Sequence, residues 1–310
     1  MISALHVGFS KCGSTFLQSY FSQIEQIDYI EKSRFFSPVL ENYNNFEKGL
    51  KYYNSLFKNP SNKDIRLESD EHIILPDYHP VLKSRGTTLN SVDIVIDRIS
   101  RYDPHTKIIL VIRNQYDLII SRYSQYVVSG GTFPITKFLN EFVSGSTDGN
   151  NYFENYYYII INKLYDAFGK DNILVVLQER LRNRQDETLK ALNKFLDLKK
   201  NNVHQGNILN QRKGLSLSAL NLLRKFNKAF VIEKESISEP IKTIVPSFFY
   251  INLIIRGIRF FDFYLPKSWT KSKQSLLTNN LKNNLSEIFS DDNKKLETLF
   301  NIQLSKFGYI

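Results

Sequence analysis

Two short segments that consist almost entirely of apolar residues set the strongest limit on the fold. Residues 107–112 read KIILVI and residues 172–177 read NILVVL, and β-branched side chains are frequent in both. Such runs are typical of strands that are buried on both faces of a parallel sheet. Because parallel strands need crossover connections, which are usually helices, the chain is predicted to be an α/β protein.

Further strands and helices are predicted to alternate along the first 200 residues. Residues 4–9 and 65–69 are predicted strands, and residues 28–64, which are aromatic and rich in Asn, are interpreted as helix and loop. Apolar spacing predicts helices over residues 14–27, 89–101, about 115–128, 154–168 and 185–198. The alternation predicts a central parallel sheet with helices on both faces.

Beyond residue 200 the pattern changes. Residues 215–230 and 274–307 are predicted helices, and residues 199–214 are interpreted as a hinge or loop. We therefore expect a single domain over residues 1–310. It would consist of a core over about residues 1–215 and a mainly helical extension over about residues 216–310.

The charge balance and the cysteine count limit the partners of the chain. Lys and Arg number 41 against 31 Asp and Glu, so the formal charge is +10. This excess predicts an anionic partner, which could be a nucleotide, a nucleic acid, an acidic glycan or an anionic lipid. The single cysteine, Cys12, excludes an internal disulfide and a cysteine zinc site.

No segment reaches the roughly 18 uninterrupted apolar residues that a membrane-spanning helix needs. The nearest candidate, residues 244–265, is interrupted by Arg256, Arg259 and Asp262. The first predicted strand starts close to the N-terminus, and no basic leader precedes it. We therefore expect no targeting segment and a cytoplasmic location.

The segment GFSKCGST lies between the first predicted strand and the first predicted helix. A loop at a helix N-terminus presents unpaired backbone N–H groups and the positive end of the helix dipole. Gly8 and Gly13 permit close approach of the backbone to a ligand. Lys11 adds a cation, and Ser14 and Thr15 add hydroxyl donors. The segment therefore predicts a phosphate-binding loop.

The position of the lysine distinguishes this loop from that of ordinary ATP- or GTP-binding proteins. In the Walker A pattern a lysine directly follows the second glycine. Here Ser14 follows Gly13, and Lys11 lies two residues before it. The displacement counts against a nucleotide kinase or NTPase, which remains the alternative enzyme.

Residues 4–21, ALHVGFSKCGSTFLQSYF, resemble the 5′-phosphosulfate loop of sulfotransferases that use 3′-phosphoadenosine 5′-phosphosulfate (PAPS). The family pattern is roughly G-x-x-K-x-G-[ST]-[ST] and then an aromatic or apolar residue. The resemblance implies that PAPS is bound by Lys11, Cys12, Gly13, Ser14, Thr15 and Phe16. Cys12 fills a variable position and is interpreted as packing, not as a nucleophile.

A second point of resemblance follows the apolar segment 107–112. In the family, an Arg at this strand end and a Ser eight residues later hold the 3′-phosphate, and Arg113 and Ser121 have that spacing. Open α/β sheets bind ligands at the carboxyl ends of their strands, and a guanidinium can bind phosphate bidentately. The family often has Pro where Gln115 stands.

A third, shorter match is the segment QRKG at residues 211–214. It resembles a loop that touches the 3′-phosphate in some members, which adds Arg212, Lys213 and Gly214 as candidates. The resemblance covers residues 2 to about 215. It implies a P-loop-NTPase-like sulfotransferase fold.

The resemblance implies in-line transfer of a sulfuryl group to a hydroxyl or an amine, with adenosine 3′,5′-bisphosphate as product and no metal. Lys11 would stabilise the charge on the leaving oxygen. Family members use His or Glu near the end of the next strand as base. Glu71 stands there, and Glu68 and His72 are the alternatives.

The acceptor is expected to be a carbohydrate, either a polysaccharide or a glycolipid, because the early loop is most similar to carbohydrate-acting and bacterial members. Aromatic clusters at residues 152–158 and 248–250 could line a sugar-binding surface, but core packing is the simpler interpretation. His6 is interpreted as a core histidine.

Two alternatives concern other partners. Residues 244–273 are aromatic and cationic, so they could rest on a membrane surface and reach a lipid-linked acceptor. The simpler interpretation is a buried C-terminal helix with surface arginines. A non-enzymatic binder of acidic glycan or nucleic acid would also suit the positive charge. No RNP-like, helix-turn-helix or zinc-finger pattern is present, so we expect no nucleic-acid partner.

Overall fold

The computed structural model describes residues 2–9, 11–31, 63–69, 88–144, 156–199, 214–231, 244, 250–264 and 272–309. The chain forms two compact units with interleaved ranges. The first consists of Met1–Arg113, Phe153–Gln211 and Asp292–Phe307, and the second of Asn114–Tyr152, Arg212–Asp291 and Gly308–Ile310. The expectation of a single domain over residues 1–310 stays a prediction.

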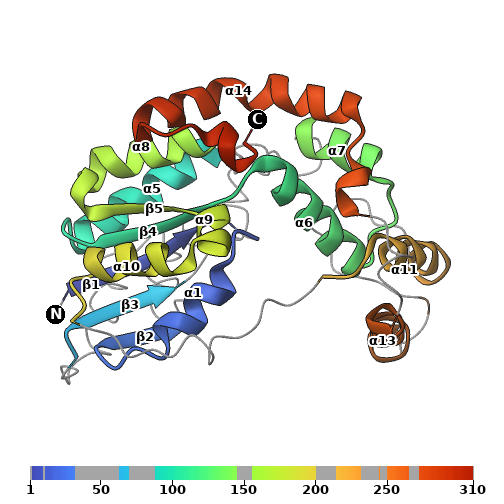
Figure 1. Ribbon diagram of the computed structural model, residues 1–310, viewed down its shortest axis with the longest axis horizontal. Coiled ribbons are helices and arrows are strands. Elements are labelled where there is room, and N and C mark those ends of the chain that lie inside the picture. The colour runs from blue at the N-terminus through green and yellow to red at the C-terminus, as the bar shows by residue number, and fades with distance from the viewer. Residues whose placement is uncertain are drawn as a thin grey trace. The chain divides into compact units, whose positions relative to one another are not determined.

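A five-stranded, all-parallel sheet forms the centre of the first unit, with the order β2-β3-β1-β4-β5 (Figure 1). The strands are β1 (Ile2–Gly8), β2 (Ile27–Glu31), β3 (Ile65–Ser69), β4 (Lys107–Ile112) and β5 (Ile173–Leu177). β1 lies between β3 and β4, and Gly8 is opposite Val111. β3 and β2 lie on one side of β1, and β4 and β5 lie on the other. The carboxyl ends of β1 and β4 therefore form a switch point of the kind where open α/β sheets bind ligands.

Helices cover both faces of this sheet. Figure 1 shows α1 (Ser14–Phe21) and α10 (Gln185–Phe195) on one face, and α5 (Thr88–Tyr102) and α8 (Tyr157–Phe168) on the other. All five residues from Ile108 to Ile112 are buried between these layers. This burial explains why the central strand is a continuous apolar run, and the α/β prediction is confirmed.

Smaller elements complete the first unit. They are the 3₁₀-helix η3 (Lys170–Asn172), α9 (Gln178–Asn183), the 3₁₀-helix η8 (Leu304–Phe307) and the last part of α14 (Asn279–Phe300). Buried Asp292 of α14 accepts hydrogen bonds from the backbone N–H of Tyr158 at 3.2 Å. The carboxylate thereby caps the first turn of α8.

The second unit is helical in the residues that the structure describes. It contains α6 (Gln115–Val128), α7 (Ile135–Ser144), α11 (Leu217–Phe230), the π-helix η5 (Tyr250–Ile255), α13 (Arg256–Tyr264), the 3₁₀-helix η7 (Lys273–Leu276) and the first part of α14. Buried Asn227 of α11 donates to the carbonyls of Val127 and Gly131 at 2.7 and 2.8 Å. The backbone N–H of Ser216, the N-cap of α11, donates to Asp262 of α13 at 2.8 Å. Hydrogen bonds therefore connect α11 with its N-cap to both α13 and the end of α6.

Several predicted element bounds need correction. The helix predicted over residues 14–27 ends at Phe21, and the interpretation of residues 28–64 as helix and loop is wrong for residues 28–31, which belong to β2. Residues 32–62 lie outside the described part. A five-residue strand is too short to show a periodicity of its own, and its pairing with β3 decides its conformation. Helices α7 and α9 are not predicted from the sequence, whereas α13 lies within the segment 244–273 that is interpreted as a C-terminal helix.

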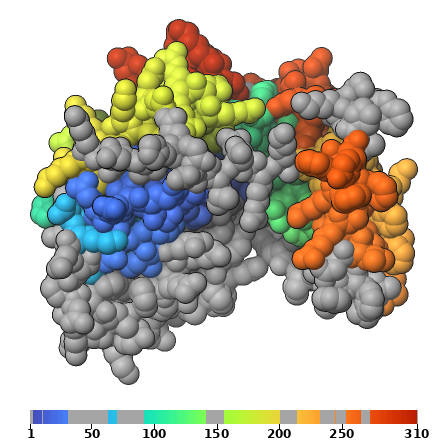
Figure 2. Space-filling model, turned by 60° about the horizontal axis from the view of Figure 1, so that its bottom comes forward, coloured from blue at the N-terminus to red at the C-terminus, as the bar shows by residue number. Residues whose placement is uncertain are grey.

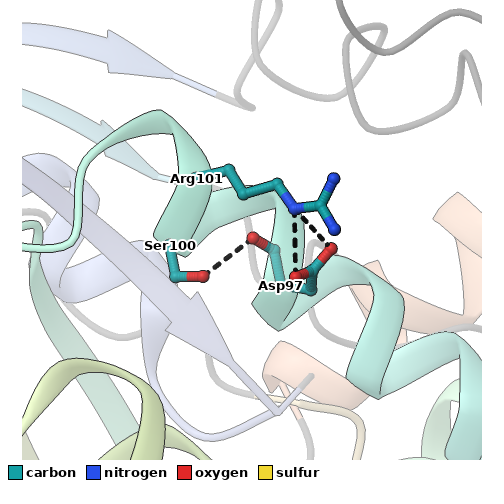
Figure 3. Close-up of polar contacts among 3 residues, drawn as sticks. All are labelled: Asp97, Ser100 and Arg101. Carbon is teal, nitrogen blue, oxygen red and sulfur yellow. Dashed lines mark hydrogen bonds and ion pairs between the residues drawn. The ribbon is translucent and has the colours of Figure 1, made fainter.

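The exposed surface of α5 carries an ion pair of a common type. On α5, the exposed Arg101 Nε lies 3.0 Å from a carboxylate oxygen of Asp97, and Ser100 Oγ donates to the Asp97 carbonyl at 2.8 Å (Figure 3). A pair at this i,i+4 spacing stabilises a helix by about 0.3–0.5 kcal/mol.

Within the described ranges, no helix combines the length and the apolar character needed to cross a membrane.

Candidate active site

The loop after β1 has the backbone geometry of an anion-binding turn. Gly8 has φ +137°, and a Cβ at this position would lie 3.0 Å from Leu110 Cδ1 of β4. Lys11 and Gly13 both adopt left-handed conformations, with φ of 68° and 102°. The Gly13 carbonyl accepts a hydrogen bond from the Phe16 N–H at 3.0 Å. These conformations turn the chain sharply from β1 into α1.

The N-terminus of α1 keeps its positive electrostatic character. Gly13 precedes the helix and offers no side-chain cap, and the first turn of α1 contains no acidic residue. Ser14 is buried at this end and Thr15 is exposed. The helix's own side chains therefore do not neutralise the positive end of its dipole, which suits a bound anion.

A buried aromatic layer is adjacent to the loop. Phe9 packs edge-to-face on Tyr157, with 4.6 Å between the ring centroids, and the two residues are 1% and 0% exposed. Cys12 is also fully buried, which agrees with its interpretation as a packing residue. Phe16 is half-buried. The loop therefore begins next to a close-packed layer that holds its first residues in place.

Arg113 connects the end of β4 to this loop. Its Nη1 donates to the Lys11 carbonyl at 3.0 Å, and its own carbonyl accepts a hydrogen bond from the Tyr157 hydroxyl at 2.7 Å. The first of these bonds spans 102 residues of sequence. The structure thus brings two of the sequence-predicted motifs together at the carboxyl edge of β1 and β4.

A buried polar cluster lies at the carboxyl end of β3. His6 Nδ1 lies 2.7 Å from Ser69 Oγ, and Gln18 Nε2 donates to the same oxygen at 3.3 Å. Because Ser69 accepts from Gln18, its hydroxyl proton is available to His6 Nδ1. Burial lowers the pKa of His6 from its usual 6.5 to about 4, so the imidazole is neutral at pH 7. The interpretation of His6 as a core histidine is confirmed.

The base is not decided by the described residues. Glu68 is the penultimate residue of β3, and its side chain is buried. Glu71, the first candidate, and His72 lie outside the described part of the chain. The assignment of Glu71 as base stays a prediction.

Ser121 belongs to the second compact unit, where it is half-exposed on α6. Asn114 is the N-cap of this helix, and its side chain accepts a hydrogen bond from the Asp117 N–H at 2.9 Å. Ser121 lies six residues after Gln115, which is about 9 Å along the helix. Gln115, the first residue of α6, is fully buried.

The third predicted contact is only partly described. Arg212 and Lys213 lie outside the described residues, whereas Gly214 belongs to the second unit. A Cβ at Gly214 would lie 3.0 Å from Lys273 Nζ, so this cation lies against the glycine backbone. The sequence does not single out Lys273 as a candidate site residue. Its 59-residue separation from Gly214 offers no local signal of the contact.

The described residues contain no group of three or more His, Cys, Asp and Glu side chains that could hold a metal ion. What they bring together is a glycine-containing loop, the N-terminus of α1 and a strand-end guanidinium. These groups suit phosphate or sulfate oxygens.

Comparison with known proteins identifies one matching family and several solved structures of similar fold. The sulfotransferase domain family matches residues 3–239. The chain is similar to a sulfotransferase from Alicyclobacillus acidocaldarius, with 16% identity, a TM-score of 0.59 and coverage of 99% of this chain and 98% of that one. It is also similar to the mouse sulfotransferase SULT7A1 complexed with PAP, with 14% identity, a TM-score of 0.48 and coverage of 94% and 83%. The search of curated proteins finds no match.

Proposed function

We propose, from the premise that this chain belongs to the sulfotransferase family, that it transfers a sulfuryl group from PAPS to a hydroxyl or an amine of an acceptor. The observation that carries the proposal is the hydrogen bond from Arg113 Nη1 to the Lys11 carbonyl at 3.0 Å. It places a guanidinium beside a phosphate-type loop. PAPS has phosphate groups at both the 3′ and 5′ positions of one ribose, so it offers an anion to each of these elements.

The donor would be held by the residues that the sequence singles out. Lys11, Cys12, Gly13, Ser14, Thr15 and Phe16 would bind the 5′-phosphosulfate. Arg113 and Ser121, together with Arg212, Lys213 and Gly214, would bind the 3′-phosphate. Because Arg113 also contacts the Lys11 carbonyl, occupation of one phosphate position would orient the other.

The reaction is an in-line displacement at sulfur. The acceptor oxygen or nitrogen forms a bond to sulfur while the bond from sulfur to the bridging phosphate oxygen breaks. Lys11 stabilises the negative charge on that oxygen, and the acceptor proton passes to Glu71, with Glu68 and His72 as the alternatives. Adenosine 3′,5′-bisphosphate leaves, and no metal takes part in this scheme.

For the acceptor we propose a carbohydrate, either a polysaccharide or a glycolipid. The support is the similarity of the early loop to carbohydrate-acting and bacterial sulfotransferases. Reaction in the cytoplasm, and a peripheral contact with a membrane that presents a lipid-linked acceptor, belong to the same proposal.

The test is thermal stabilisation by adenosine 3′,5′-bisphosphate without magnesium, compared with AMP and with ATP plus magnesium. A ligand at about 100 times its Kd adds about 2.7 kcal/mol to the stability of the native state. We therefore expect a rise of several degrees in Tm with the bisphosphate and little change with the controls. In Arg113→Ala the rise should disappear.

Arg101→Ala is the matched control, since it removes an exposed arginine from α5 of the same unit. It should respond to the bisphosphate as the wild type does, and the Tm of each variant without ligand shows whether it is folded. Stabilisation by ATP with magnesium alone would indicate a kinase or NTPase. No response to any nucleotide would favour a non-enzymatic binder of acidic glycan or nucleic acid.

A further inference from the structure

The exposed large apolar side chains of the described residues all belong to the second unit. They are Leu222, Phe226, Ile244, Leu253, Phe260, Phe261, Phe263 and Tyr264. The four aromatic residues at the end of α13, Phe260, Phe261, Phe263 and Tyr264, are 62%, 69%, 81% and 67% exposed. We call these four the aromatic ridge. Exposed apolar patches of this kind mark interaction sites.

The other side of α13 already has its partners. Ile255 and Ile258 are buried, and Asp262 accepts a hydrogen bond from the Ser216 N–H. Ile258 and Asp262 are four residues apart and lie on one face of α13, and Ile255 is the last residue of η5, directly before this helix. The aromatic ridge lies on the remaining surface, so α13 is apolar on two sides. A surface helix is usually apolar on one side only, so this pattern is not typical of a helix that faces water.

The rings of the ridge contact one another but do not cover one another. Ring centroids are 4.8 Å apart for Phe260 and Tyr264 and 5.2 Å apart for Phe263 and Tyr264. Figure 2 shows residues 250–264, in orange, at the surface of the molecule. The ridge is therefore a contiguous patch and not a set of isolated surface side chains.

Among the described residues of α11, η5 and α13, the charged side chains are almost all positive. Residues 217–231 and 250–264 contain five basic side chains, namely Arg224, Lys225, Lys228, Arg256 and Arg259, and a single acidic one, Asp262. Arg256 and Arg259 are exposed on α13 itself. Asp262 is engaged with the Ser216 N–H. On the described residues of these helices, exposed aromatic rings therefore occur together with an excess of basic side chains.

We propose that α13 lies in the interface of an anionic lipid bilayer. The aromatic ridge would enter the boundary between headgroups and acyl chains, and Arg256 and Arg259 would contact lipid phosphates. Aromatic rings favour this depth, and cations near an anionic leaflet are attracted to it. A second copy of the chain would instead bring two positive surfaces together, which disfavours association. The inference needs no step of the proposed reaction, although a lipid-linked acceptor would be presented at the same surface.

The test is flotation of the full chain with lipid vesicles. One set contains phosphatidylcholine alone, and the other contains phosphatidylcholine and phosphatidylglycerol at a ratio of 70 to 30. Two arginines near the surface should make binding to the anionic vesicles at least about tenfold stronger. The double variant Phe260→Ser, Phe263→Ser should weaken that binding by about tenfold or more, because it removes two inserted rings.

Charge variants supply the matched control. Arg256→Gln with Arg259→Gln should reduce binding to anionic vesicles roughly tenfold, whereas Arg182→Gln with Lys190→Gln removes the same charge from exposed positions of the first unit. The second pair should have little effect. All substituted side chains are exposed, so Tm should be unchanged in every variant. If the phenylalanine variant is nevertheless unfolded, Leu253→Ser tests the same surface from η5.

Three outcomes would overturn the inference. The wild type could fail to float with either vesicle, or the two charge pairs could weaken binding equally. A dimer in sedimentation that Phe260→Ser, Phe263→Ser converts to monomer would assign the ridge to a second copy. No nucleotide enters these measurements, so they stand apart from the bisphosphate test. A chain that binds vesicles without binding bisphosphate would contradict the proposed function alone.

Discussion

Aromatic side chains have opposite environments in the two units of this protein. In the first unit, Phe9 and Tyr157 are fully enclosed, and the Tyr157 hydroxyl is bonded to the Arg113 carbonyl. In the second unit, Phe260, Phe263 and Tyr264 are mostly exposed at the end of α13. Both regions have several aromatic residues within a few positions of sequence. Local composition therefore does not decide whether a ring supports the core or forms an external surface.

The difference follows from what each region packs against. Phe9 directly follows a central strand and lies between the sheet and α8, where it has neighbours on every side. η5 buries Ile255, and the following α13 buries Ile258. Its rings are additional apolar surface beyond what the unit needs for its own core.

Alanine substitution at one ring in each region is the strongest way to break this comparison. Phe9→Ala should lower the free energy of unfolding by about 3–5 kcal/mol, because it leaves a cavity beside Tyr157. Phe263→Ala should change it by no more than about 0.5 kcal/mol, because the ring is already exposed. Urea unfolding measures both. Equal losses would mean that Phe263 is covered in solution.

The second prediction concerns acid unfolding of the first unit, where His6 is part of the buried polar cluster. Between pH 6.5 and about 4 the unfolded chain binds a proton at His6 and the folded chain does not, since burial lowers the folded pKa to about 4. Stability should therefore fall as the pH falls through this window, by a total on the order of 3 kcal/mol.

The pH dependence is tested by urea unfolding of His6→Asn, with His105→Asn as control because His105 is exposed. The His6 variant should lose less stability than the wild type between pH 6.5 and 4, and the His105 variant should behave like the wild type. Identical pH profiles for all three proteins would show that His6 is charged in the folded state.

The smallest expected effect concerns single hydroxyl groups. Tyr157→Phe and Tyr20→Phe each remove one hydrogen bond of 2.7 Å, to the Arg113 carbonyl and to Asn193 respectively. Each should cost about 1 kcal/mol in urea unfolding. Only Tyr157→Phe should also reduce the Tm rise with adenosine 3′,5′-bisphosphate, since Tyr157 positions Arg113. A reduction of similar size in both variants would assign Tyr157 a purely structural role.

The parallel sheet could be predicted from the sequence because its central strand β4 has a recognisable pattern of its own. Residues 107–112 are buried on both faces, and this demand leaves a continuous apolar run that can be recognised without any partner. β2 has no such signal. Its residues Ile27 and Tyr29 form a strand because they pair with Ile65 and Leu67, which are distant in the chain.

The features of the candidate site also differ in how far they could be predicted from the sequence. The loop from Gly8 to Thr15 could be recognised because its residues are contiguous and because glycine stands at Gly8 and Gly13, where φ is positive. The contact of Arg113 with the Lys11 carbonyl could be expected only as proximity, from the switch point in the sheet. The contribution of Tyr157, and the approach of Lys273 to Gly214, depend on tertiary packing that no local pattern encodes.

The left-handed backbone of Lys11 has a consequence for the evolution of this chain. A side chain in this conformation is disfavoured by about 1–2 kcal/mol relative to glycine, so the position is one at which stability could easily be improved. Selection for heat resistance alone would favour Lys11→Gly, and the same substitution would remove the only cation of the loop. If Lys11 acts as proposed, stability and activity oppose each other at this residue.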